Sequence, residues 1–272
     1  MLLPLLFLLA AAPLFDYDRS RPLDVRQDIQ VRDISFANLS GGRTQAYVVR
    51  PAKKGRYAGV LFVHWYEPES ADSNRTQFLQ QATELARHGT VSLLVETMWS
   101  DPKWFLARDP SADYANSVKQ VKELRRALDV LLADPEVDPN RVAYVGHDFG
   151  AMYGAVLSGV DRRPKAWALQ AGTTSFSDWY LLARKLDQAG RKQVVDELAP
   201  LNPVKFIASA APAPVFLQFG RKDKYVPEAK AQEFFEAAKE PKRIEFYDAG
   251  HALNQQAIDD RQPWLIQVLK LP

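Results

Sequence analysis

Cysteine is absent from the 272-residue sequence, which excludes disulfide bonds, a thiolate nucleophile and cysteine-ligated metal sites. Histidine is scarce: only His64, His88, His147 and His251 occur, and they are too dispersed for a known zinc-binding motif. The glycine spacing of a phosphate-binding or dinucleotide-binding loop is missing too. We therefore expect neither a metal ion nor an organic cofactor.

An excess of charge of either sign is also missing. The 35 basic and 33 acidic residues give a net charge of +2, and no basic run occurs that could follow a phosphate backbone. Nucleic acid is therefore not an expected partner.

One apolar run opens the sequence, and it is too short to span a bilayer. MLLPLLFLLAAA, residues 1–12, ends in small residues where a signal peptidase could cut, although no Lys or Arg precedes it. We interpret this run as the export signal of a secreted or periplasmic protein, which would keep no stable membrane anchor after cleavage. A buried N-terminal segment is the alternative interpretation.

The remaining chain, residues 30–272, is expected to form one domain. Two alternating runs, residues 33–38 and 44–50, flank paired glycines and predict an antiparallel hairpin. Six short apolar runs follow, separated by segments that can be helical: residues 58–65, 90–96, 141–147, 165–172, 213–220 and 243–250. Such alternation is typical of a parallel sheet buried on both faces. The pattern predicts an α/β fold, with a mostly parallel eight-stranded sheet flanked by helices.

Helices are predicted from the spacing of apolar residues. This spacing indicates helices over residues 76–89 and 116–135, and two more are expected over 227–239 and 259–270, the last with Pro263 near its start. Residues 173–210 interrupt the alternation and leave room for two or three helices, a length that suits a short helical lid.

A motif with chemical content lies at Gly146-His147-Asp148-Phe149-Gly150. Gly-x-nucleophile-x-Gly between a buried strand and a helix is a nucleophile elbow, a strained turn that makes the central side chain project above the sheet. Asp148 therefore occupies the position of a nucleophile. Its structural alternative is to cap the helix that follows.

Two further residues fall just past strand ends downstream of the elbow. Asp223 follows residues 213–220 and His251 follows residues 243–250, which gives the order nucleophile, acid, histidine. The carboxyl ends of parallel strands meet at one edge of a sheet, so the three loops can converge there. As alternatives, Asp223 would be a surface turn residue and His251 would cap the last helix.

From Asp33 to the C-terminus the chain resembles an α/β-hydrolase. Its compact layout is similar to that of dienelactone hydrolases and related esterases, although dienelactone hydrolases carry a cysteine at the elbow. The elbow GHDFG is similar to the Gly-His-Asp-aromatic-Gly of epoxide hydrolases and haloalkane dehalogenases, which use an aspartate nucleophile and have a larger cap. Dehalogenases usually place Trp after the nucleophile, where this chain has Phe149.

An aspartate nucleophile suits attack on an sp³ carbon bearing a halide or a strained oxygen, because the resulting alkyl ester can be hydrolysed at its carbonyl. We therefore predict a hydrolase of a small, partly apolar substrate, with Asp148 as nucleophile, His251 as general base and Asp223 orienting the imidazole. The alternatives are a dienelactone-hydrolase-like ester hydrolase, in which Asp148 activates water, and a non-catalytic binding protein on the same fold.

Amide donors and aromatic side chains are expected around these residues. The oxyanion hole would use the N–H of Phe149 and that of either Trp65 or Tyr66. His64 is expected beneath the site in a structural role. Candidate substrate contacts, including an indole N–H toward a halide or a phenol toward an epoxide oxygen, are Glu96, Trp99, Trp104, Trp179 and Tyr180.

Overall fold

The computed structural model describes residues 15–17, 24–26, 28–69, 75–182 and 184–272. The predicted export signal, residues 1–12, lies outside the described residues and stays a prediction. In the part of the chain that is described, no helix is both long and apolar enough to cross a membrane.

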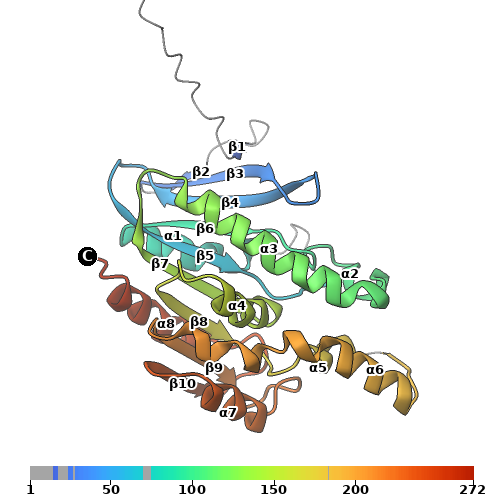
Figure 1. Cartoon of the computed structure of the whole chain (residues 1–272). Helices are drawn as coiled ribbons and strands as arrows, with labels where there is room; N and C mark the ends of the chain where they lie inside the picture. The colour runs from blue at the N-terminus through green and yellow to red at the C-terminus, as the bar shows by residue number, and fades with distance from the viewer. Residues whose placement is uncertain (1–14, 18–23, 27, 70–74, 183) are drawn as a thin grey trace, which may run out of the picture.

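The described strands form one sheet in the order β1-β3-β4-β6-β5-β7-β8-β9-β10, with β2 paired to β3 (Figure 1). The strands are β1 (Phe15–Tyr17), β2 (Asp24–Arg26), β3 (Ile29–Ala37), β4 (Arg43–Pro51), β5 (Tyr57–Val63), β6 (Thr90–Val95), β7 (Val137–His147), β8 (Ala166–Gln170), β9 (Val215–Gly220) and β10 (Lys242–Tyr247). The eight predicted strands correspond to β3–β10. The two short strands β1 and β2 extend the antiparallel edge beyond that prediction.

Strand direction also agrees with the sequence pattern. The β3–β4 hairpin and the β4–β6 pair are antiparallel, whereas the pairs from β6 through β5, β7, β8 and β9 to β10 are parallel. Every residue of β6, β8 and β9 is buried. Because both faces of these strands are covered, their sequences show continuous apolar runs instead of strict alternation.

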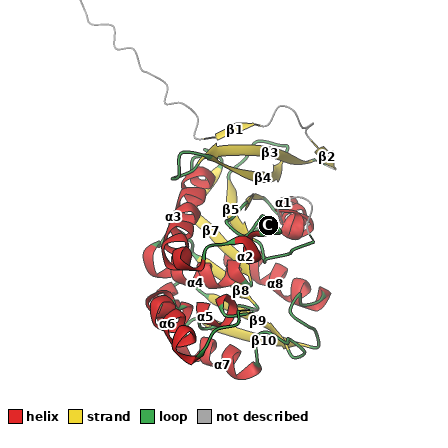
Figure 2. Cartoon of the chain, turned by 90° about the vertical axis from the view of Figure 1, so that its right-hand side faces the viewer, coloured by secondary structure: helices red, strands yellow, loops and turns green. Residues whose placement is uncertain are grey.

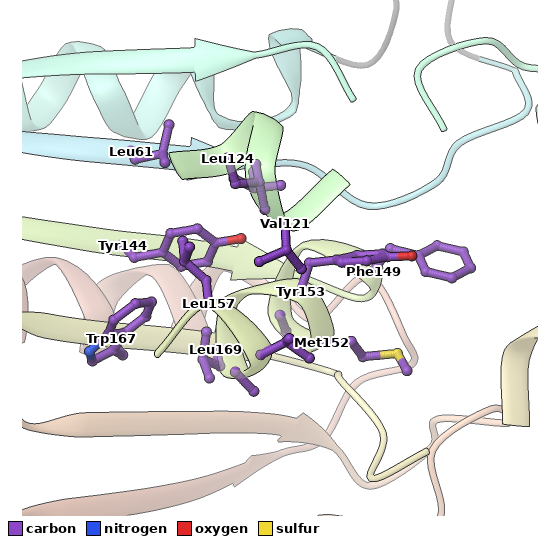
Figure 3. Close-up of a cluster of buried hydrophobic side chains, with 14 of the residues drawn as sticks. Leu61, Val121, Leu124, Tyr144, Phe149, Met152, Tyr153, Leu157, Trp167 and Leu169 are labelled. Carbon is purple, nitrogen blue, oxygen red and sulfur yellow. The ribbon is translucent and has the colours of Figure 1, made fainter. Parts of the chain in front are cut away.

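Helices cover both faces of the sheet (Figure 2). They are α1 (Leu79–Arg87), α2 (Trp104–Ala107), α3 (Asp113–Leu132), α4 (Phe149–Val160), α5 (Phe176–Tyr180), α6 (Gln188–Leu198), α7 (Glu228–Ala237) and α8 (Gln255–Val268). Helices α1 and α8 pack on one face, and α3, α4 and α7 pack on the other. Figure 3 shows the core on the α3/α4 side, where Leu124 of α3 and Leu157 of α4 join Tyr144 of β7 and Leu169 of β8.

The segment between β8 and β9 contains α5, α6 and three short 3₁₀ turns, at Ala199–Leu201, Pro203–Lys205 and Ile207–Ala210. The described residues of this segment therefore contain helices, and the role of residues 173–210 as a lid stays a prediction. One detail of the helix prediction is wrong. The last helix begins at Gln255, so Pro263 lies in its interior instead of near its start. Asn254 caps this helix by accepting from the Ala257 amide, which fixes the earlier start.

Candidate active site

The turn between β7 and α4 holds Asp148 in a strained conformation, with φ 55° and ψ −118°. Glycine is needed on both sides of this residue. A Cβ atom on Gly146 would lie 2.4 Å from the carbonyl oxygen of Gly150, and one on Gly150 would lie 2.1 Å from that of Val63. The sequence Gly-x-Asp-x-Gly therefore folds into an elbow because larger residues would collide with backbone atoms. Such strain persists only where surrounding structure enforces it.

The carboxylate of Asp148 is buried and does not cap its own helix. Its Oδ2 accepts a hydrogen bond of 3.1 Å from the backbone N–H of Tyr66, in the loop after β5. Its Oδ1 has no hydrogen-bond partner among the described residues and lies 3.9 Å from Nε2 of His251. One oxygen is therefore held and the other is free to react.

His251 is oriented by Asp223, as predicted. Its Nδ1 lies 2.7 Å from Oδ2 of Asp223, so Nδ1–H donates to the carboxylate and Nε2 faces Asp148 with its lone pair. Oδ1 of Asp223 accepts from the amides of Tyr225 and Val226. Asp223 is thus both a turn residue and the partner of the imidazole. His251 does not cap α8, because Asn254 has that role.

Burial and charge shift the pKa values of this pair. Burial raises the pKa of Asp148 to about 7, although the charge of His251 and the amides of Tyr66 and Phe149 favour the carboxylate. Burial also lowers the pKa of His251, but the hydrogen bond to Asp223 and the charge of Asp148 outweigh it. The pKa of His251 is therefore above its usual value. Asp148 therefore changes protonation near neutral pH, within the range that acid–base chemistry uses, and His251 holds its proton more strongly than a free imidazole does.

His147 contacts the loop that carries His251, a role that the sequence does not indicate. His147, next to the nucleophile position, places Nε2 2.8 Å from the carbonyl oxygen of His251. Burial holds the pKa of His147 well below its usual value, so the neutral ring donates its single N–H to this carbonyl. The strand that presents Asp148 therefore also fixes the loop that presents His251.

Of the two amides considered as oxyanion donors, only that of Tyr66 contacts Asp148. The Trp65 amide donates instead to Oε1 of Gln77, at 2.8 Å, so its expected role as a donor at the site is wrong. The Trp65 ring packs against His147, with ring centroids 4.7 Å apart. His64 is buried and contacts the hydroxyls of Ser100 and Thr97, which agrees with a structural role.

Three expected substrate contacts lie elsewhere. Trp99 is fully buried, stacks on Tyr153 and donates to the carbonyl of His64, so it belongs to the core. Glu96 accepts from the Gln45 amide and lines a separate cavity of about 400 Å³. Tyr180 is also fully buried, and its hydroxyl lies 2.9 Å from that of Tyr153. The phenol of Tyr180 is therefore bonded within the core and not directed to a substrate.

Two other aromatic candidates do approach the site. The Trp179 ring lies 5.2 Å from the His251 ring and 5.7 Å from that of Phe149, measured between centroids. Its Nε1–H is buried and has no acceptor among the described residues. Trp104 packs edge-on against Phe149 at 5.5 Å. The indole of Trp179 is thus a hydrogen-bond donor beside His251 that has no acceptor among the described residues.

No group of three or more His, Asp or Glu side chains suited to hold a metal ion occurs in the described part of the chain. The arrangement of Asp148, His251 and Asp223 can support nucleophilic or general-base chemistry using side chains alone.

This topology, with its elbow after β7 and its acid and histidine after β9 and β10, is the α/β-hydrolase fold. The sequence matches no protein-family model, and no curated protein matches it significantly.

Solved structures share this fold. An acetyl xylan esterase from Paenibacillus sp. R4 superposes with a TM-score of 0.72 at 16% identity, over 93% of this chain and 87% of that one. Acetyl xylan esterase 1 from a Thermoanaerobacterium species gives 0.70 at 13% identity, over 94% and 88%. A putative dienelactone hydrolase from Klebsiella pneumoniae gives 0.65 at 17% identity, over 89% and 98%. The predicted dienelactone-hydrolase-like fold is confirmed.

Proposed function

We propose that the protein is a hydrolase that displaces a leaving group from an sp³ carbon of a small, partly apolar substrate, with Asp148 as the nucleophile. The observation that carries this proposal is the hydrogen bond from the Tyr66 amide to Oδ2 of Asp148, at 3.1 Å. An amide in this position would normally receive the carbonyl oxygen of a substrate ester. Here the enzyme's own carboxylate occupies it.

The first step uses the free oxygen. Oδ1 of Asp148 attacks the carbon, the bond to the leaving group breaks, and an alkyl ester of Asp148 forms. A halide leaves as the anion, whereas an opened epoxide keeps its oxygen on the neighbouring carbon as an alkoxide that takes up a proton from solvent. The Nε1–H of Trp179 lies beside His251 and has no acceptor among the described residues. It can donate a hydrogen bond to a halide or an alkoxide as that group leaves the carbon.

The second step uses His251. Its Nε2 accepts a proton from water, and the resulting hydroxide attacks the ester carbon of Asp148. Negative charge then develops on Oδ2, which already accepts from Tyr66. The tetrahedral intermediate collapses and the leaving alkoxide takes the proton back from His251. Asp148 is left as a carboxylic acid with one oxygen from water, and it loses its proton to solvent to regenerate the carboxylate. The amide donors therefore stabilise the hydrolysis of the enzyme's own ester.

A carboxylic ester hydrolase is the second candidate, and the similar structures favour it, since three of them are named as acetyl xylan esterases or a dienelactone hydrolase. In this scheme Asp148 activates a water molecule. Direct attack of Asp148 on an ester is disfavoured because it would form a mixed anhydride. A non-catalytic binding protein is the third candidate, although the intact hydrogen bond between His251 and Asp223 is a feature that binding alone does not require.

Isotope labelling separates these candidates. The protein would be incubated in heavy-oxygen water with haloalkanes, epoxides and aryl esters, and the Asp148 peptide analysed by mass spectrometry after many turnovers. Incorporation of heavy oxygen into Asp148 is expected with haloalkanes or epoxides. In His251→Gln the alkyl ester should accumulate on Asp148, and Asp148→Asn is the control that forms no adduct.

Other outcomes would contradict the proposal. Ester turnover without label in Asp148 would indicate the water-activating route. If no substrate of these classes turns over, the protein would be a binding protein on this fold.

A further inference from the structure

A row of polar side chains crosses the sheet face that α1 and α8 cover. His147 of β7 is paired in register with Gln170 of β8, which is paired with Gln218 of β9. All three are buried. Their neighbours on this face are apolar, as Ala143, Val145 and Ala168 illustrate. A polar row in an apolar layer needs partners, because buried polar groups are costly when unpaired.

Helix α8 contributes a buried cation to this row. Arg261 is only 3% exposed, and its Nη1 donates to Oε1 of Gln218 at 2.6 Å. Its Nε and Nη2 both donate to Oε1 of Gln81, on α1, at 3.2 and 3.0 Å. No carboxylate of the described residues lies within 4.0 Å of this guanidinium. A buried guanidinium with only neutral partners is unusual, because desolvating a charge is costly without a counter-charge.

Two further donors around this cation lack acceptors. Nε2 of Gln81 and Nε2 of Gln170 are buried, and neither has a hydrogen-bond partner among the described residues. Burial of Arg261 lowers its pKa to about 9, which reflects the same missing negative charge. The cluster therefore has an excess of donors and of positive charge.

A cavity of about 220 Å³ lies beside these groups, lined by residues of α1, of α8 and of the loop after β10. Gln81, Gln170 and Arg261 line it, together with apolar side chains that include Phe78, Leu253 and Ile258. Glu84 lies at its wall, and its carboxylate pairs with Arg87. The cavity borders on Trp65 and His147, but Asp148, Asp223 and His251 do not line it.

We infer that this cavity binds a short-chain monocarboxylate, with its carboxylate between Arg261 and the side-chain amides of Gln81 and Gln170 and its alkyl chain against the apolar wall. A carboxylate supplies the missing charge and has two oxygens for several donors at once. The apolar lining favours a short alkyl chain over a bare inorganic anion. This site is additional to the reaction centre and does not depend on the chemistry proposed for Asp148.

Thermal unfolding of the full-length protein tests the inference, because a ligand that binds the folded state raises the unfolding temperature with saturation. Sodium acetate and sodium butyrate would be compared with sodium chloride at equal ionic strength. Saturable stabilisation is expected with the carboxylates and not with chloride, and butyrate should bind more tightly than acetate.

Two nearly isosteric variants locate the binding. Gln170→Leu removes one donor, and Gln81→Glu provides Arg261 with an internal carboxylate that replaces the ligand. Each should weaken butyrate binding at least about tenfold, and Gln81→Glu should raise the unfolding temperature without ligand. Gln232→Glu adds the same charge on an exposed position of α7 and should leave butyrate binding unchanged.

Three outcomes would overturn the inference. The carboxylates could give no saturable stabilisation, chloride could stabilise equally, or binding could persist unchanged in both Gln170→Leu and Gln81→Glu. The last result would place the bound carboxylate elsewhere on the protein.

Discussion

Oδ1 of Asp148 and Nε2 of His251 face each other at 3.9 Å, and neither atom has a hydrogen-bond partner among the described residues. This separation exceeds that of a direct hydrogen bond. It suits the proposed mechanism, in which the carboxylate reacts with substrate first and the imidazole activates water afterwards. A permanent hydrogen bond between them would reduce the nucleophilicity of Oδ1.

The rate of the first step is expected to depend on the ionisation of Asp148. Burial raises the pKa of this group to about 7, and only the ionised form can attack carbon. Below pH 7, kcat/KM should therefore rise about tenfold per pH unit, and it should level off above that value. A profile of kcat/KM between pH 5 and pH 9 measures this. A flat profile from pH 5.5 to 8.5 would contradict the role of Asp148 as nucleophile.

Replacing Asp148 should stabilise the protein at neutral pH. The carboxyl group is protonated in both states below its unfolded pKa of 3.8, and the folded protein loses stability as pH rises through about 7, because ionisation is then less favourable in the folded state. Burial lowers the pKa of His251, but Asp223 and Asp148 raise it overall, so the stability that His251 contributes is present below its unfolded pKa of 6.5 and is lost as the pH rises through its folded pKa.

Asp148→Asn should thus exceed the wild type in unfolding free energy by a few kcal/mol at pH 8 and by little at pH 4. Chemical denaturation at the two pH values measures the difference. Equal unfolding free energies of Asp148→Asn and the wild type at pH 8 would show that the buried, ionised Asp148 does not destabilise the folded protein.

The sheet and the elbow could be predicted from the sequence because each depends on local patterns. Buried parallel strands require continuous apolar runs, and the close approach of Gly150 to the Val63 carbonyl requires glycine. Asp223 and His251 were found because the fold places loops after successive strands at one edge. Strands β1 and β2 were missed because three residues are too few to show a period.

The orientation of aromatic side chains could not be predicted in the same way. Trp99 and Tyr180 are residue types that often line pockets, but their N–H and O–H groups form hydrogen bonds inside the core. The role of His147 depends on a backbone carbonyl 104 positions downstream, which no local pattern reports. The sequence indicates the amide of either Trp65 or Tyr66 as the second oxyanion donor. Gln77 distinguishes the two, because its side chain accepts the hydrogen bond of the Trp65 amide.

The two neighbouring aromatic residues of α5 should respond differently to loss of their polar groups. Trp179→Phe removes an unpartnered N–H beside His251, so kcat/KM for a haloalkane should fall about tenfold or more. Tyr180→Phe should keep kcat/KM within about threefold and cost about 1 kcal/mol of stability, since the Tyr153 and Ser117 hydroxyls remain bonded to each other. Steady-state kinetics with matched unfolding curves measure both effects. The reverse order of effects would assign the donor role to Tyr180.

His147 is expected to act by positioning. His147→Leu would leave the partly buried carbonyl of His251 without its donor, which should lower kcat about tenfold and cost about 1–3 kcal/mol of stability. His147→Gln can still donate a hydrogen bond and should recover part of the kcat. If Leu and Gln gave the same kcat, the hydrogen bond to the His251 loop would not be the relevant contact.

The elbow glycines should be the least replaceable residues near the site. Gly150→Ala would place a Cβ atom 2.1 Å from the Val63 carbonyl oxygen, and this backbone atom can move only if β5 or α4 shifts. We expect a loss of at least about 2 kcal/mol in the unfolding free energy. Gly250→Ala is the matched control, because a Cβ atom there meets no other atom within 4 Å. Since Gly250 lies directly before His251, its tolerance of alanine would show that the demand for glycine at position 150 comes from the elbow and not from proximity to the site.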